Sequence, residues 1–146
     1  MDNQLKDQVR ELILEDSEIV ALLGANHDPY NKTGAPSHEH SVIDYINASP
    51  EVVAPFITIR AGESVFAGPT TLTNAFILLR CYNEKDKTFY TINEVMSRVR
   101  KLLNGHIFTL EGYANVETVW ETTSAELPDE GLDLRYREIQ FRVQLT

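Results

Sequence analysis

Residues 134–145 read LRYREIQFRVQL, and from Glu138 onward apolar and polar side chains alternate one by one. One face of this stretch carries the apolar residues Ile139, Phe141, Val143 and Leu145. The other face carries the polar residues Glu138, Gln140, Arg142 and Gln144. Because successive side chains of a strand point to opposite faces, the pattern predicts a long strand with one buried and one solvated face.

Three further stretches are typical of strands. Residues 56–60 are rich in β-branched side chains and lie between a proline and a glycine. Residues 72–82 are apolar on both faces in their second half, which predicts a central position in the sheet. Residues 113–125 alternate again, and residues 127–131 are predicted to form a turn before the last strand.

Two helices are predicted before the first of these strands in the sequence, and a third is predicted after the second strand. Residues 5–14 place Leu5, Val9, Leu12 and Ile13 on one face. A short helix over residues 18–23 is expected to be capped by Asp16-Ser17 and ended by Gly24. Residues 91–103 have apolar residues at helical spacing and begin with Thr91-Ile92-Asn93-Glu94, a predicted capping box. Asn104-Gly105 should end this helix.

These elements predict a single α+β domain over residues 1–146. Its sheet should be mainly antiparallel and four-stranded, packed on one face by two main helices. Residues 25–55 and 62–69 are expected to form long loops, and loops of such length are commonly functional.

Composition limits the possible functions. The chain has 146 residues and a net charge of −9, which argues against general nucleic-acid binding through phosphate neutralisation. No apolar run approaches the roughly 20 residues that a bilayer core requires. The start Met1-Asp2-Asn3-Gln4 is acidic and polar, so no secretory signal is expected. Cys81 is the only cysteine, so no internal disulfide can form.

Candidate catalytic and metal-binding residues are few. His38-Glu39-His40, with His27 and Asp28 nearby, has metal-ligand residue types but lacks a second, well-spaced ligand pair. A solvated polar loop explains this segment better than a metal site. Cys81 lies in a strand expected to be buried, where a thiol behaves as a small apolar side chain. We therefore predict no enzymatic activity, no cofactor and no metal.

Apolar side chains within the loops predict an interaction surface. Such residues are Val42, Ile43, Tyr45 and Ile46 in the first loop and Val65 and Phe66 in the second. The first group could instead form a short element that docks on the core. Arg135 and Arg137 could pair with acidic neighbours on adjacent strands or with a neighbouring subunit.

The order of these features resembles the tail terminator proteins of long-tailed bacteriophages, also called tail completion or tail-to-head joining proteins. The resemblance rests on the first helix ending at Leu22-Leu23-Gly24 and on the strand start at residues 54–59. It continues through the central strand 76–82, the helix 91–103 and the last strand 136–143. The stretch 25–50 is longer than the family pattern.

The resemblance implies a homo-hexameric ring that caps the tail tube and stops its polymerisation. Such a ring binds the tail tube protein on one side and the head–tail connector or stopper protein on the other. DNA passes through its lumen without specific binding. The implied location is the tail–neck junction of the virion, after assembly in the host cytoplasm and without a membrane.

Three alternatives remain at this stage. Another phage neck or head completion protein would differ in partner and ring number. A small metal-dependent hydrolase would use His38, His40 and an acidic partner. A bacterial adaptor domain would have no relation to phage.

The interface hypothesis predicts that residues 42–46 and 62–71 lie at subunit or tail-tube contacts. Replacing both Val65 and Phe66 with Ser should weaken assembly and leave the fold intact. Assembly is measured by sedimentation and folding by circular dichroism. Normal assembly of this variant would contradict the placement.

Overall fold

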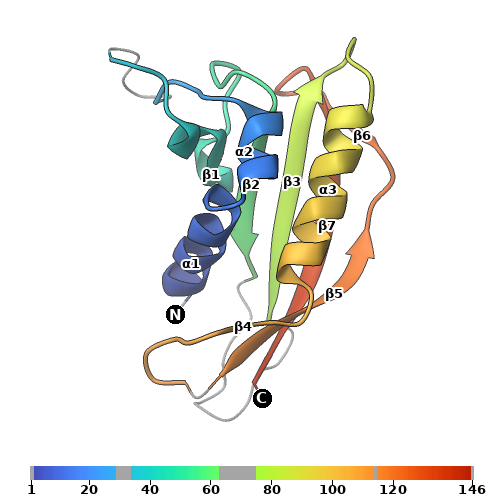
Figure 1. Ribbon diagram of the computed structural model, residues 1–146. Helices are drawn as coiled ribbons and strands as arrows, with labels where there is room; N and C mark the ends of the chain where they lie inside the picture. Colours follow the sequence, from blue (N-terminus) through green and yellow to red (C-terminus); the bar gives the residue numbers. More distant parts are fainter. Residues whose placement is uncertain (1, 29–33, 63–74, 114, 146) are drawn as a thin grey trace.

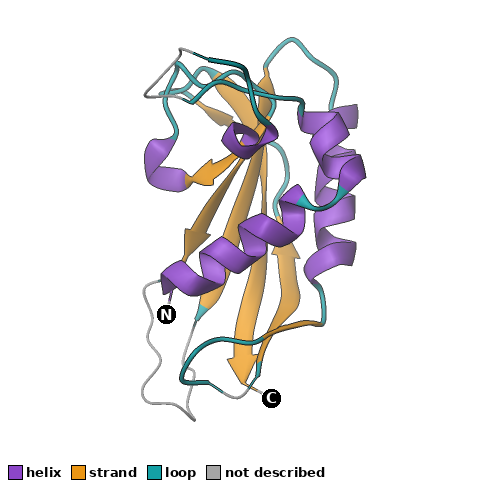
Figure 2. Ribbon diagram, turned by 60° about the vertical axis from the view of Figure 1, so that its left-hand side comes forward, coloured by secondary structure: helices purple, strands orange, loops and turns teal. Residues whose placement is uncertain are grey.

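The last strand predicted from the sequence lies in the middle of a mixed, seven-stranded sheet. The computed structural model describes residues 2–28, 34–62, 75–113 and 115–145. Along the main path the strand order is β1-β2-β3-β7-β5-β4, and β6 pairs with β7 (Figure 1). The three α-helices lie on one face of this sheet (Figure 2). The α+β class is thus confirmed.

The strands of the main path have the following bounds: β1 Val42–Asp44, β2 Phe56–Ala61, β3 Phe76–Glu84, β7 Leu134–Leu145, β5 Val116–Thr123 and β4 His106–Phe108. The remaining strand, β6, spans Leu127–Asp129. β1 runs parallel to β2, and every other pairing is antiparallel. β7 pairs with β3 from Leu134 to Arg142 and with β5 from Ile139 to Leu145.

The prediction of a four-stranded sheet is wrong because three short strands were missed. β1, β4 and β6 have only three residues each. A three-residue strand has too few positions for an alternation of apolar and polar residues to be visible. Residues 127–131, predicted as a turn, contain β6, and the predicted loop 25–55 contains β1. That loop also contains two 3-10 helices, η1 (His38–Ser41) and η2 (Tyr45–Asn47).

The helices are α1 (Asp2–Leu14), α2 (Ser17–Leu23) and α3 (Tyr90–Leu103). They cover the sheet face that carries Ile139, Phe141 and Val143, so the predicted burial of that face is confirmed. From the helices, Leu5, Val9, Ile13, Ile19, Val95 and Val99 pack into the same core. Within the described part of the chain, the helices do not have the length and apolarity needed to cross a membrane.

A second apolar cluster lies on the opposite face of the sheet, which was predicted to be solvated. It contains Ile43, Val52, Phe56, Tyr82 and Leu134. In β7 the alternation of apolar and polar side chains begins at Glu138, so the pattern that predicts a solvated face does not include Leu134 and Tyr136.

Helix ends follow the predicted signals at both ends of α2 and at the end of α3, where Asn104 is the C-cap, but not at the start of α3. Asp16 caps α2 by accepting hydrogen bonds from the amides of Glu18 and Ile19, and Gly24 ends it with φ +76°. α3 begins at Tyr90 and has no side-chain cap, so the capping box predicted for Thr91 and Glu94 is wrong. The N-cap position is occupied by Phe89, so Thr91 lies within the first turn of the helix, two residues too late to cap it.

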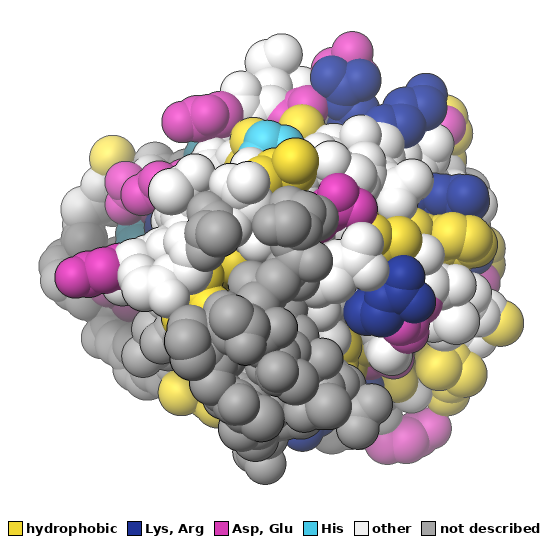
Figure 3. Space-filling view, turned by 90° about the horizontal axis from the view of Figure 1, so that it is seen from below, with side chains coloured by type: hydrophobic (Ala, Val, Ile, Leu, Met, Phe, Trp, Pro, Cys, Tyr) yellow, Lys and Arg dark blue, Asp and Glu magenta, His cyan; other side chains and the backbone are white. Residues whose placement is uncertain are grey.

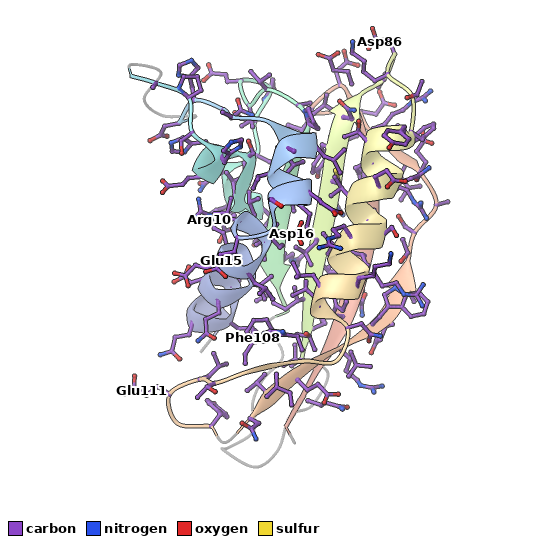
Figure 4. All side chains as sticks on the ribbon, viewed as in Figure 1. Arg10, Glu15, Asp16, Asp86, Phe108 and Glu111 are labelled. Carbon is purple, nitrogen blue, oxygen red and sulfur yellow. The ribbon has the colours of Figure 1, made fainter. Side chains whose placement is uncertain are left out.

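The carboxylate of Asp16 also joins the helices (Figure 4). Its Oδ1 accepts the two amide hydrogen bonds of α2, and its Oδ2 accepts one from Nε of Arg98 on α3 at 2.9 Å. The Asp16 side chain is only 5% exposed. One buried carboxylate therefore fixes the corner between α1 and α2 and ties it to α3.

Polar side chains of α1 bind the edge strand β1. Nε of Arg10 donates to the carbonyl of Val42 at 2.7 Å, and its Nη2 donates to the carbonyl of Glu39. Nζ of Lys6 pairs with the carboxylate of Asp44 at 2.6 Å. These contacts attach the first part of the long loop to the helical layer.

Replacing Asp16 with Ala should lower the free energy of unfolding by about 2 kcal/mol, because the variant loses the cap and the charged hydrogen bond. Urea denaturation measures this change. The control Glu15→Ala, at an exposed neighbouring position, should change stability by less than about 0.5 kcal/mol. Equal stability of the two variants would show that the corner does not depend on Asp16.

Candidate functional site

A pocket of about 400 Å³ lies on the sheet face opposite the helices. Its floor comes from β2, β3 and β7, and its walls come from η2 on one side and the β6–β7 turn on the other. The residues lining it are Tyr45, Ala48, Thr58, Arg60, Leu78, Arg80, Tyr82, Asp129, Gly131, Leu132 and Glu138. The pocket is thus built by strand alternation on the floor and by two connections at the rim.

Cross-strand register places the floor residues in rows. Thr58 on β2 faces Arg80 on β3, and Arg80 faces Glu138 on β7. The next row contains Phe56, Tyr82 and Tyr136. Residues two apart on a strand share a face, so both rows point away from the helices.

The aromatic row closes one end of the pocket. The rings of Phe56 and Tyr82 stack with centroids 4.9 Å apart, and those of Tyr82 and Tyr136 are 5.2 Å apart. Burial raises the pKa of the Tyr82 hydroxyl, although Arg80 beside it acts in the opposite direction. Tyr82 therefore stays neutral at physiological pH and serves as a packing and hydrogen-bonding group.

Arg80 is held on three sides. Its Nε donates to Oε1 of Glu138 at 2.8 Å, its Nη1 donates to the hydroxyl of Tyr82 at 3.3 Å, and its guanidinium lies 4.4 Å from the ring centroid of Tyr136. Burial lowers the pKa of Arg80, but the contacts with Tyr82 and Glu138 together leave it raised. Arg80 and Glu138 thus form a fixed, mutually neutralised ion pair.

Arg60 and Tyr45 form the β2 side of the pocket. The guanidinium of Arg60 lies 5.2 Å from the centroid of the Tyr45 ring. Cation–π contact at such a distance is favourable and restricts the arginine side chain. The described residues that line the pocket are charged, aromatic, small and aliphatic, with two arginines and two carboxylates among them.

The interface residues predicted from the sequence have different surroundings. Val42 and Ile43 are buried, whereas Tyr45 is 43% exposed and Ile46 is 69% exposed. The first loop therefore includes both of the expected arrangements: an element docked on the core and an exposed apolar pair. Val65 and Phe66 lie outside the described residues.

Arg135 and Arg137 bind within the chain. Nη1 of Arg135 pairs at 3.1 Å with Glu126, which lies in the connection between β5 and β6 and not on a strand. Arg137 donates instead to the carbonyl of Ser124 and to the amide oxygen of Asn93. The contact of these residues with a second subunit remains a prediction.

Pocket-forming residues were missed by sequence reasoning for a clear reason. Arg60, Arg80 and Glu138 look like ordinary solvated residues on alternating strands. Only the register of three strands brings them together, and a single strand pattern does not contain that register. The sequence feature closest to this pocket was the apolar group in the first loop, because Tyr45 of that group lines the pocket.

The metal-binding hypothesis gains no support from the geometry. His38 and His40 lie in η1, and among the described residues no three side chains of His, Cys, Asp or Glu gather as metal ligands do. The hydrolase alternative that uses these histidines therefore has no observed site.

Two arginines of α3 have partners within the chain. Arg98 pairs with Asp16 and Glu18, and the guanidinium of Arg100 lies 3.7 Å from the ring centroid of Trp120. At the end of the molecule that carries the C-terminus, acidic, basic and apolar side chains are interspersed (Figure 3). Among the described residues in this view, the basic side chains thus form no continuous stripe of the kind typical of nucleic-acid-binding surfaces.

Comparison with known proteins gives one informative structure. No protein-family model matches the chain, and no curated protein matches it. The chain is similar in fold to one chain of the solved structure described as "Virion of native gene transfer agent (GTA) particle", with a TM-score of 0.56. The two are 16% identical, and the match covers 97% of this chain and 93% of the other. At this identity, the likeness shows a shared fold.

Cys81 provides a test of the packing beneath the site. It is fully buried on β3, and burial raises the pKa of its thiol to about 12. Because the thiolate is the reactive form, native protein at pH 8 should react with Ellman's reagent far more slowly than protein in 6 M urea. Rapid, complete labelling of the native protein would contradict the buried position.

Proposed function

We propose that this chain is a structural protein of a phage-like virion, where it forms a closed ring of six copies at the end of the tail tube. The ring stops tube polymerisation and joins the tail to the head connector, and DNA passes through its lumen. It acts at the tail–neck junction after assembly in the host cytoplasm.

The observation that carries this proposal is the fold likeness to a chain of a gene transfer agent virion. The match extends over nearly all of both chains, so it concerns the whole architecture and not one common motif. Fold alone does not determine function. The likeness therefore supports a particle component, and the tail-end role comes from the separate sequence resemblance to tail terminator proteins.

Exposed apolar side chains on opposite sides of the sheet fit a ring. A closed ring needs two different, complementary patches on each subunit. On the β1 side, Tyr45, Ile46 and Val53 are exposed, and we name them the β1-side patch. On the other side, Ile107 of β4 is 50% exposed, and we name the surface around it the β4-side patch. The strand order separates the two patches.

The charge of the chain fits a channel for DNA. A surface that grips DNA needs clustered Lys and Arg, whereas a net charge of −9 repels phosphates and allows DNA to pass. Another neck protein would meet the same requirement, so the partner that binds the ring distinguishes the two roles.

Ring formation is tested with one variant in each patch, Ile46→Ser and Ile107→Ser. Burying an Ile side chain contributes about 2 kcal/mol, so each variant should weaken its interface by more than about tenfold. A mixture of the two variants retains one intact interface per pair. It should therefore form dimers where wild-type protein forms rings near six subunits. Light scattering measures the mass, with and without isolated tail tubes.

The exposed variant Asp86→Asn is the matched control and should assemble like wild type. Rings that form equally well with both Ser variants would exclude these patches. Wild-type protein that stays monomeric and fails to bind tail tubes would overturn the proposed role at the tail end. Binding to the head connector without binding to the tube would favour another neck protein.

A further inference from the structure

We infer that the pocket on the outer face of the sheet binds a short acidic segment of a partner protein. A carboxylate of the segment pairs with Arg60, and apolar side chains beside it pack on the pocket wall. This site goes beyond ring formation, because it concerns one subunit and a linear segment.

Arg60 carries the first part of the inference. Its guanidinium is exposed and is oriented by the ring of Tyr45. Among the described residues, no carboxylate lies within ion-pair distance of it, whereas the other charged groups of the pocket have contacts within the chain. Arginine presents several donors in a planar fork that suits a carboxylate.

The remaining charges determine where an acidic group can bind. Arg80 and Glu138 neutralise each other at 2.8 Å. Asp129 accepts a hydrogen bond from the amide of Leu132 and lies on β6, beyond β3 and β7 from Arg60. Three strand spacings separate these two sides by about 14 Å. Asp129 therefore repels a carboxylate from its own wall and leaves the Arg60 side as the favourable position.

Apolar surface beside Arg60 specifies the rest of the segment. Leu78 lies opposite Arg60 in the strand register and is partly exposed. Ala48 and Leu132 line the walls. Because an exposed ion pair alone contributes little to binding, the occupant needs apolar side chains next to its carboxylate. A protein segment supplies both, which a free small carboxylate does not.

The test uses two peptides that differ by one charge, acetyl-Leu-Glu-Leu-amide and acetyl-Leu-Gln-Leu-amide. Each is titrated at millimolar concentration into the protein of residues 1–146, and amide chemical shifts are followed by NMR. We expect the Glu peptide to bind about threefold to fivefold more tightly than the Gln peptide. The shifts should centre on Thr58, Arg60 and Leu78.

Arg60→Gln should remove the difference between the peptides, whereas Lys101→Gln, which removes an exposed cation from α3, should preserve it. The spectrum of each variant without peptide shows whether it is folded. Sodium propionate should give no saturable shifts at these residues.

Equal binding of the two peptides, or an unchanged preference in Arg60→Gln, would overturn the inference. Propionate binding as tight as that of the Glu peptide would also overturn it, because the carboxylate alone would then suffice. The titration detects binding to a single subunit, so its failure is distinguishable from a failure to form rings.

Discussion

The position of β7 between β3 and β5 constrains the rest of the structure. β7 pairs with β3 at its beginning and with β5 at its end, and both registers are antiparallel. A shift of one residue in either register would turn Ile139, Phe141 and Val143 away from the helices. Since these residues form the floor of the main core, the helical layer can pack only when β7 is in this register. The same register aligns Arg80 with Glu138 on the opposite face.

Each face of the sheet therefore has a separate role. The face under the helices is mainly apolar and buried, and it includes the thiol of Cys81. The other face has an aromatic row, an ion pair and an open pocket in the same three strands. The larger apolar cluster lies on the first face, and a smaller one lies beside the pocket on the second.

Sequence reasoning predicted the parts of the fold that have long periodic patterns. The alternation after Glu138 and the apolar spacing in residues 91–103 correspond to β7 and α3. Asp16 and Gly24 marked the ends of α2 because caps depend on local chemistry. The three-residue strands were missed because they are defined by their partners. Arg60, Arg80 and Glu138 converge only through strand register, so the pocket was not predictable from one strand at a time. For the apolar residues of the first loop, the sequence left docking on the core and surface exposure both open, and the structure buries Val42 and Ile43 and exposes Tyr45 and Ile46.

The attachment of α1 to β1 has a consequence for the solubility of the free subunit. Edge strands present unpaired backbone groups and can recruit further strands, which leads to aggregation. Here Arg10 already occupies the carbonyl of Val42, and Lys6 holds the side chain of Asp44. An incoming strand would have to displace both cations from the edge. The chain can thus expose Tyr45 and Ile46 next to this edge while remaining protected from uncontrolled β-sheet extension, and its association can stay limited to side-chain contacts.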